Sequence, residues 1–230
     1  CLLPDGAIII AVSLRNGDAI LDHDGKELPV DQKGVHDHVY RSTDGGLSWD
    51  DRTPIMRDSA ESNFVSLGGD RVLAVVRRQR WYSHPDDPPG FWKQTGGSPE
   101  MIYKHIFLVD SHDGGRTWHG SRQWTRKEGD CPGELVRLSD GRVVLIHCSR
   151  YPNERSHVRA RVSEDAGRSW SDQSYVVSEG SGYPGSVVLG DDTIVTVCGN
   201  TKLKPTSKHY ISPHANAEPW SVHAVRWHLP

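Results

Sequence analysis

Residues 42–49 of the chain read Ser-Thr-Asp-Gly-Gly-Leu-Ser-Trp, and the same arrangement returns at residues 111–118 and 163–170. All three octapeptides have the pattern S-x-D-x-G-x-[ST]-W. An Asp side chain can hydrogen-bond to its own backbone two residues on, a Gly supplies a positive φ, and a Trp can pack back over the turn. Each octapeptide is therefore expected to close a tight hairpin, and three copies indicate a repeat architecture.

A second repeated pattern lies out of phase with the octapeptides. A Leu opens a turn rich in Asp and Gly, and a run rich in Val and Ile follows the turn. The pattern begins at Leu3, Leu67, Leu138 and Leu189. A turn followed by such a run is typical of a buried strand that comes after a hairpin, so the chain contains four units.

The repeated units predict an all-β fold. No stretch has a sustained 3.6-residue apolar period with helix caps, whereas short strands recur with turn signals between them. Radial repetition of small sheets of this kind produces a β-propeller. We expect one such domain over residues 1–230, with about four blades' worth of sequence.

Composition limits the classes of partner. The chain has 230 residues, of which 35% are hydrophobic and 25% charged, and its formal net charge is −3. This balance gives no broad attraction to nucleic acid, and no apolar run approaches the roughly 20 residues of a membrane-spanning helix. The four cysteines have neither C-x-x-C spacing nor the Cys/His pairs of a zinc site. We therefore expect no nucleic acid, no membrane insertion, no metal and no cofactor.

The octapeptides and the strands between them resemble the exo-sialidase (neuraminidase) superfamily, whose fold is a six-bladed propeller and in which the octapeptide is called an Asp-box. The resemblance extends over nearly the whole chain. Asp-boxes are specific for the architecture and weak evidence of activity, because related boxes occur in receptors. Residues 2–6 read as the middle of a unit, and the family's first arginine, in an R-I-P segment, has no counterpart here. These two features predict a chain that is incomplete at its N-terminus.

Function is sought where the units differ, because a residue present in every blade is expected to be structural. Six residues before the repeated Leu stand Glu61, Pro132 and Tyr183, and ten residues after Leu67 stands Arg77. Sialidases are similar at these places, with a general-base Glu, a carboxylate-binding Arg and, in the final blade, a nucleophilic Tyr. The resemblance implies these roles for Glu61, Arg77 and Tyr183. A structural ion pair between Glu61 and Arg77 is the alternative.

Two further residues come from the resemblance alone. The family's arginine triad has a member several residues before an Asp-box, which points to Arg155, with Arg150 as a competitor. The acid/base Asp of the family lies on a loop before the first Asp-box, which points to Asp31, with Asp37 as the alternative.

These residue types suit the hydrolysis of sialosides. Sialic acid carries a carboxylate on its anomeric carbon, so a neutral Tyr activated by Glu attacks without the repulsion that an anionic nucleophile meets. Arginines bind the carboxylate through forked hydrogen bonds, and an Asp protonates the leaving oxygen. The prediction is a retaining exo-sialidase-like glycoside hydrolase acting on sialylated or other anionic glycans. The resemblance also suggests a secreted or periplasmic location. The alternative is a catalytically inactive propeller that binds glycans or proteins.

The segment 80–100 contains four prolines and four aromatic residues and interrupts the repeat. It reads as an inserted loop, which either packs on itself at the surface or covers a substrate.

Overall fold

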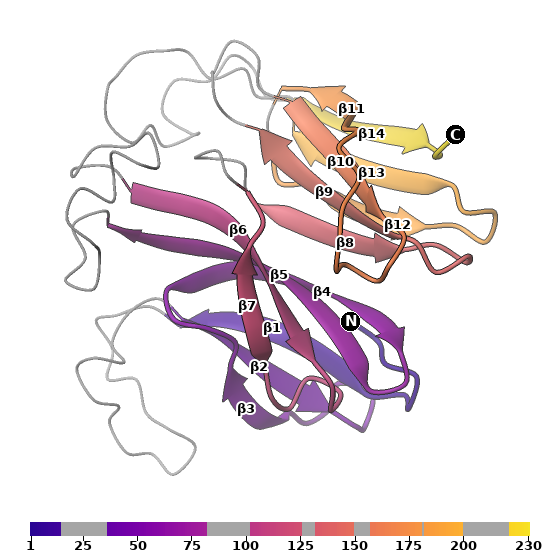
Figure 1. The fold of residues 1–230 in the computed structure, drawn as a ribbon. Coiled ribbons are helices and arrows are strands. Elements are labelled where there is room, and N and C mark those ends of the chain that lie inside the picture. Colours follow the sequence, from indigo (N-terminus) through magenta and orange to yellow (C-terminus); the bar gives the residue numbers. More distant parts are fainter. Residues whose placement is uncertain (15–35, 82–101, 126–131, 150–156, 181, 200–220) are drawn as a thin grey trace. The chain divides into compact units, whose positions relative to one another are not determined.

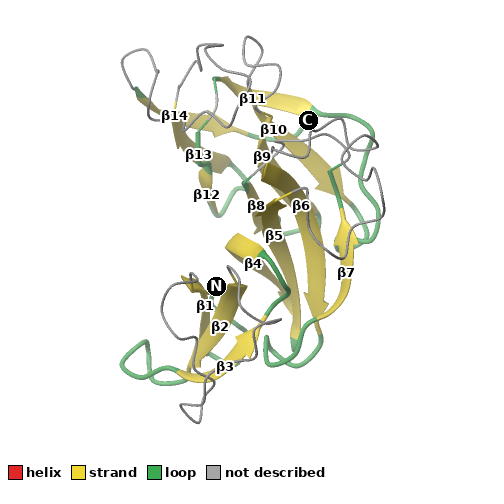
Figure 2. Cartoon of the chain, turned by 90° about the vertical axis from the view of Figure 1, so that its left-hand side faces the viewer, coloured by secondary structure: helices red, strands yellow, loops and turns green. Residues whose placement is uncertain are grey.

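The computed structural model describes residues 1–14, 36–81, 102–125, 132–149, 157–180, 182–199 and 221–230. The described residues form antiparallel β-sheets and contain no helix (Figure 2). The expected all-β class is therefore confirmed. They also contain no helix long and apolar enough to cross a membrane.

The described residues contain fourteen strands in four sheets, and each sheet is built from strands that are consecutive in sequence (Figure 1). The first sheet contains β1 (Ile8–Leu14), β2 (His36–Ser42) and β3 (Asp50–Pro54). The second contains β4 (Ser59–Gly68), β5 (Arg71–Trp81), β6 (Ile102–Ser111) and β7 (His119–Gln123).

The third sheet contains β8 (Gly133–Arg137), β9 (Val143–Ser149), β10 (His157–Ser163) and β11 (Tyr175–Glu179). The fourth contains β12 (Gly185–Val188), β13 (Ile194–Gly199) and β14 (Val222–Trp227). Four sheets agree with the four units found in the sequence. The strand β5 runs two residues into the predicted inserted loop, and residues 82–101 lie outside the described part.

The chain divides into two compact units. The first consists of Cys1–Gln79 and Phe107–Gln123, and the second of Arg80–Ile106 and Trp124–Pro230. Each unit has its own apolar core, and the expectation of a single domain over residues 1–230 stays a prediction.

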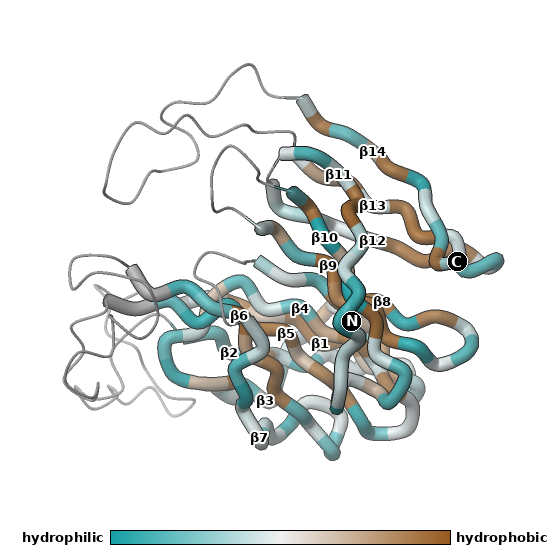
Figure 3. Tube along the Cα trace, turned by 45° about the horizontal axis from the view of Figure 1, so that its top comes forward, coloured by the Kyte–Doolittle hydropathy of each residue, from teal (hydrophilic) through white to brown (hydrophobic). Residues whose placement is uncertain are grey.

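The two cores come mainly from the Val- and Ile-rich strands that follow the repeated Leu, with further residues from β6 and β10. In the first unit Ile9, Val72, Ala74 and Val109 are buried together, and in the second unit Val144, Ile146, Val158 and Ile194 are. Figure 3 shows hydrophobic colour along the middle strands β5 and β9. Every residue of β9 is buried, as expected of a strand covered on both faces. The packing of the sheets within each unit thus follows largely from the repeated sequence pattern.

Candidate functional site

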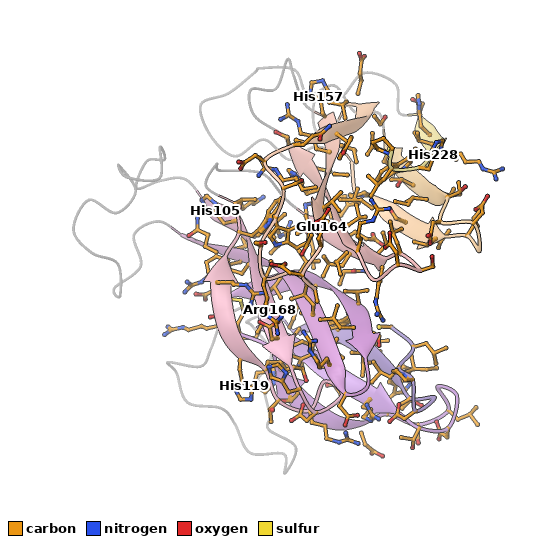
Figure 4. The ribbon with its side chains drawn as sticks, turned by 45° about the vertical axis from the view of Figure 1, so that its right-hand side comes forward. His105, His119, His157, Glu164, Arg168 and His228 are labelled. Atoms are coloured by element: carbon orange, nitrogen blue, oxygen red, sulfur yellow. The ribbon has the colours of Figure 1, made fainter. Side chains whose placement is uncertain are left out.

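The three Asp-boxes form nearly the same hydrogen-bond network. In each box the first Ser Oγ accepts the backbone N–H of the second glycine position at 2.8 Å. That Ser also donates to Asp Oδ1 at 2.8 Å, and Asp Oδ2 accepts the hydroxyl of the Ser or Thr four residues on. Glu164 and Arg168, labelled in Figure 4, occupy variable positions of the third box.

The carboxylates of the Asp-boxes are held ionised by these bonds. Hydrogen bonds from the Ser169 hydroxyl and amide lower the pKa of Asp165 to about 2. At Asp113 burial acts in the opposite direction, but the bonds from Thr117 and Ser111 outweigh it and lower the pKa to about 2. A carboxylate used in this way stabilises a turn, so the boxes belong to the architecture and not to a site.

Two positions differ between the repeats: the residue six before the repeated Leu and the residue ten after it. In each sheet described next, both positions lie at the same end. In the second sheet they are Glu61 and Arg77, which form an ion pair across β4 and β5. In the third sheet they are Pro132 and Cys148, where the Pro132 carbonyl accepts the Cys148 backbone N–H at 3.3 Å. In the fourth sheet they are Tyr183, which lies two residues before β12, and Gly199, which is the last residue of β13. The comparison of units therefore selected structurally equivalent places.

Glu61 and Arg77 form the most constrained charged pair at these places. Arg77 Nη1 lies 2.5 Å from Glu61 Oε2, and the side chains are 9% and 28% exposed, respectively. Glu61 has φ 53°, the left-handed region that a residue with a Cβ rarely adopts, and the register of β4 against β5 shifts between Ala60 and Asn63. Backbone strain of this kind is concentrated at functional sites. The Glu61 side chain is thus partly exposed, whereas the Arg77 side chain is buried.

Tyr183 lies in the second unit, two residues before β12, and is 52% exposed. Its segment is tied to the neighbouring sheet, because the Ser186 backbone N–H donates to Glu134 Oε1 on β8 at 3.0 Å. Burial raises the pKa of Glu134. Glu134 was not singled out from the sequence. The available signal was one carboxylate within the apolar segment Gly133–Leu138.

Asp37, the alternative to Asp31, is fully buried in β2. Its carboxylate accepts hydrogen bonds from Ser13 and Ser62. A general acid has to touch the leaving-group oxygen, and the environment of Asp37 is that of an internal hydrogen-bond acceptor. Asp31, Arg155 and Arg150 lie outside the described residues, so their roles stay predictions.

Metal binding finds no support in the described part of the chain, where no group of three or more His, Cys, Asp and Glu side chains could hold an ion.

Comparison with known proteins identifies the architecture. The family model of the BNR repeat-like domain matches residues 1–197. The Hadza microbial sialidase Hz136 is similar with a TM-score of 0.61 and 15% identity, over 85% of this chain and 40% of that chain. A point mutant of the NanB sialidase from Streptococcus pneumoniae gives a TM-score of 0.61 and 14% identity, over 99% of this chain and 30% of that chain.

The similar structures also include an enzyme with another named specificity. The alpha-L-arabinofuranosidase of Fusarium graminearum, solved with arabinobiose, gives a TM-score of 0.57 and 12% identity, over 98% of this chain and 60% of that chain. No curated protein matches the sequence. The chain thus spans less than two thirds of these three solved structures. At such identities the likeness shows the fold alone, and it confirms the expected β-propeller class. The match of the family model over residues 1–197 confirms the expected family of repeats.

Proposed function

This chain belongs to the family of BNR repeat-like domains, and we propose that it is an exo-sialidase-like glycoside hydrolase that releases a terminal sialic acid or related anionic sugar with retention of configuration. The observation that carries the proposal is the ion pair between Glu61 and Arg77, at the strained start of β4. A carboxylate and a guanidinium in this setting supply both a base and an anion-binding group.

In the proposed mechanism Tyr183 is the nucleophile and Glu61 is its general base. Glu61 accepts the phenol proton as the Tyr183 oxygen attacks the anomeric carbon and the glycosidic bond breaks. Asp31 gives its proton to the leaving oxygen. In the second step Asp31 takes a proton from the water that attacks the anomeric carbon, the bond between the sugar and the Tyr183 oxygen breaks, and Glu61 returns the phenol proton to Tyr183. The half-exposed phenol of Tyr183 is accessible to such a substrate.

Arg77 and Arg155 are proposed to bind the carboxylate of the sugar. A guanidinium has five N–H donors, so Arg77 can keep its contact with Glu61 and still offer donors to a substrate anion. Its burial strengthens this interaction, because a less polar environment screens charge less than water does.

The test compares Tyr183→Phe with the wild type on an aryl sialoside and an aryl arabinofuranoside. We expect turnover of the sialoside by the wild type, with the α-anomer of sialic acid as first product by NMR, and loss of at least 100-fold in kcat for the variant. The matched control is Tyr175→Phe on β11, which removes a hydroxyl from another tyrosine of the same unit.

Three outcomes would contradict the proposal. An unchanged rate in Tyr183→Phe excludes the Tyr nucleophile. Turnover of the arabinofuranoside alone assigns a different substrate. Binding of the sialoside without turnover by the wild type identifies a catalytically inactive glycan-binding module.

A further inference from the structure

We propose that Asp37 is a positioning residue that holds Glu61 against Arg77. Its buried carboxylate holds Ser62 and its backbone N–H holds Ser59, which makes a clamp on the two serines on either side of the Ala60–Glu61 step of β4. The catalytic consequence rests on the function proposed for Glu61, whereas the clamp itself is tested independently of activity. All the residues involved belong to the first compact unit.

Asp37 is built into the first sheet by its neighbours. It lies opposite Ser13 in the register of β1 and β2, and Ser13 Oγ donates to Asp37 Oδ1 at 2.5 Å. The Asp37 carbonyl accepts the backbone N–H of Ile55 at 3.0 Å. A fully buried carboxylate is costly unless donors surround it, so this position requires the bonds that it makes.

The remaining bonds of Asp37 reach β4 in the second sheet. Ser62 donates its backbone N–H to Asp37 Oδ2 at 3.0 Å and its hydroxyl to the same oxygen. In the other direction, the Asp37 backbone N–H donates to Ser59 Oγ at 2.7 Å, and Ser59 donates in turn to the Met56 carbonyl at 2.7 Å. Ser59 and Ser62 flank Ala60 and Glu61, so one residue of the first sheet fixes both ends of this short segment.

The clamp explains how Glu61 keeps an unfavourable backbone. The left-handed conformation at φ 53° disfavours a side chain, and hydrogen bonds to a charged acceptor are strong enough to offset it. Because side chains alternate between the two faces of a strand, relaxation of Glu61 to an extended conformation would turn its carboxylate away from Arg77. The register shift between Ala60 and Asn63 is the visible consequence of the clamp.

A second carboxylate–serine clamp provides a matched control. Asp192 Oδ1 accepts the backbone N–H of Ser139 at 2.8 Å, and Asp192 Oδ2 accepts the Ser139 hydroxyl at 2.6 Å. This clamp also joins two neighbouring units of the repeat, but it lies between turns of the second compact unit. Asp192→Asn therefore removes a carboxylate that accepts an N–H and a hydroxyl from one serine, as Asp37→Asn does, at a place remote in sequence from Glu61.

The experiment measures hydrogen exchange of the Ser62 amide and the NMR signal of Arg77 Nε–H in the wild type, Asp37→Asn and Asp192→Asn. We expect Ser62 exchange to accelerate about tenfold in Asp37→Asn, with a shifted Arg77 signal, because the charged acceptor is lost. Asp192→Asn should accelerate exchange of the Ser139 amide. It should leave exchange of the Ser62 amide and the Arg77 Nε–H signal as in the wild type. Ser62 exchange within twofold of the wild type in Asp37→Asn, or equal acceleration in both variants, overturns the proposal.

Ser62→Ala provides the same test if Asp37→Asn does not fold, since it removes only one hydroxyl. We expect a smaller shift of the Arg77 signal in Ser62→Ala and the wild-type signal in Ser62→Thr, which restores the hydroxyl. An unshifted signal in Ser62→Ala contradicts the clamp.

The activity measurement uses the aryl sialoside well below the unfolding temperature of each variant. We expect kcat to fall at least tenfold in Asp37→Asn and to stay within twofold of the wild type in Asp192→Asn. An Asp37→Asn variant that loses the Arg77 signal but keeps full kcat refutes the positioning role. If the wild type shows no turnover, the function proposed for Glu61 fails, and the exchange and Arg77 measurements still decide whether Asp37 positions Glu61.

Discussion

The backbone N–H of Ser186 donates to Glu134 Oε1 across 3.0 Å and ties the first strand of the fourth sheet to the first strand of the third. The bond lies three residues beyond Tyr183. Burial raises the pKa of Glu134 above its ordinary value of 4.5. Burial therefore disfavours the ionised form of the Glu134 carboxylate, which accepts this bond.

Glu134→Gln is expected to leave stability at pH 7 unchanged or higher, because the amide oxygen can still accept the Ser186 N–H and nothing is ionised. The stabilising contribution of a group whose folded pKa is raised is present below its unfolded pKa and lost as the pH rises through the folded pKa. Glu134→Ala should lose about 1–3 kcal/mol, since the partly buried Ser186 N–H is left without its acceptor. Urea unfolding at pH 7 measures both. Equal losses in the two variants would contradict this account.

His147 on β9 should make the protein less stable as the pH falls. Burial lowers its pKa from 6.5 to about 4, with smaller contributions from the charges of Arg159 and Arg161 and an opposing hydrogen bond at the Cys148 carbonyl. The unfolded chain therefore binds a proton between these values that the folded chain does not, and stability is lost as the pH falls through that window. The full effect is on the order of 3 kcal/mol.

The measurement for His147 is urea unfolding of the wild type and His147→Gln at pH 7, 5.5 and 4.5. The variant should lose less stability over this range than the wild type, although His38, whose pKa burial also lowers, keeps part of the dependence. Parallel pH profiles would show that His147 does not titrate as described.

Much of the fold followed from the sequence because its information is local. Each Asp-box is closed within eight residues, and each buried strand directly follows its Leu turn. Alignment of the repeats on their Leu also singled out Glu61 and Arg77, and the structure places these two residues in contact. The clamp of Asp37 on Ser62 was not predictable, because it spans 25 residues between two sheets and depends on their register. Glu134 was missed for the same reason.

The Asp-box glycines allow a paired test of local packing. Gly45 and Gly114 occupy the same position of two boxes, with φ 76° and 69°. A Cβ on Gly45 meets nothing within 4 Å, whereas on Gly114 it comes within 3.0 Å of Arg41 Nη1. That buried guanidinium nitrogen donates to the Gly114 carbonyl at 2.8 Å.

Gly45→Ala should therefore cost about 1–2 kcal/mol, the penalty of a left-handed residue with a side chain. Gly114→Ala should cost about 1 kcal/mol more, because the Arg41 bond is displaced as well. Thermal or urea unfolding of the two variants measures the difference. Equal losses would mean that Arg41 accommodates the methyl group freely.

The last prediction separates a functional Glu61–Arg77 pair from a structural one, using the neighbouring pair of Asp58 and Arg78 as a control. Asp58 immediately precedes β4, also has a positive φ of 59°, and its Oδ2 lies 3.4 Å from Arg78 Nη2. Both acidic residues thus face an arginine of β5 from the same short segment. Substitution by the matching amide keeps the shape of each side chain and removes its charge.

Glu61→Gln should lower kcat on the aryl sialoside by 100-fold or more, in the range expected for loss of a general base, with a change in stability of about 1 kcal/mol. Asp58→Asn should change stability by a similar amount and keep kcat within about twofold, because Asp58 has no part in the proposed chemistry. Initial rates and urea unfolding of both variants decide the matter. If the two variants lose activity equally, or only in proportion to their stability, the Glu61–Arg77 pair serves the architecture and Glu61 is not the base.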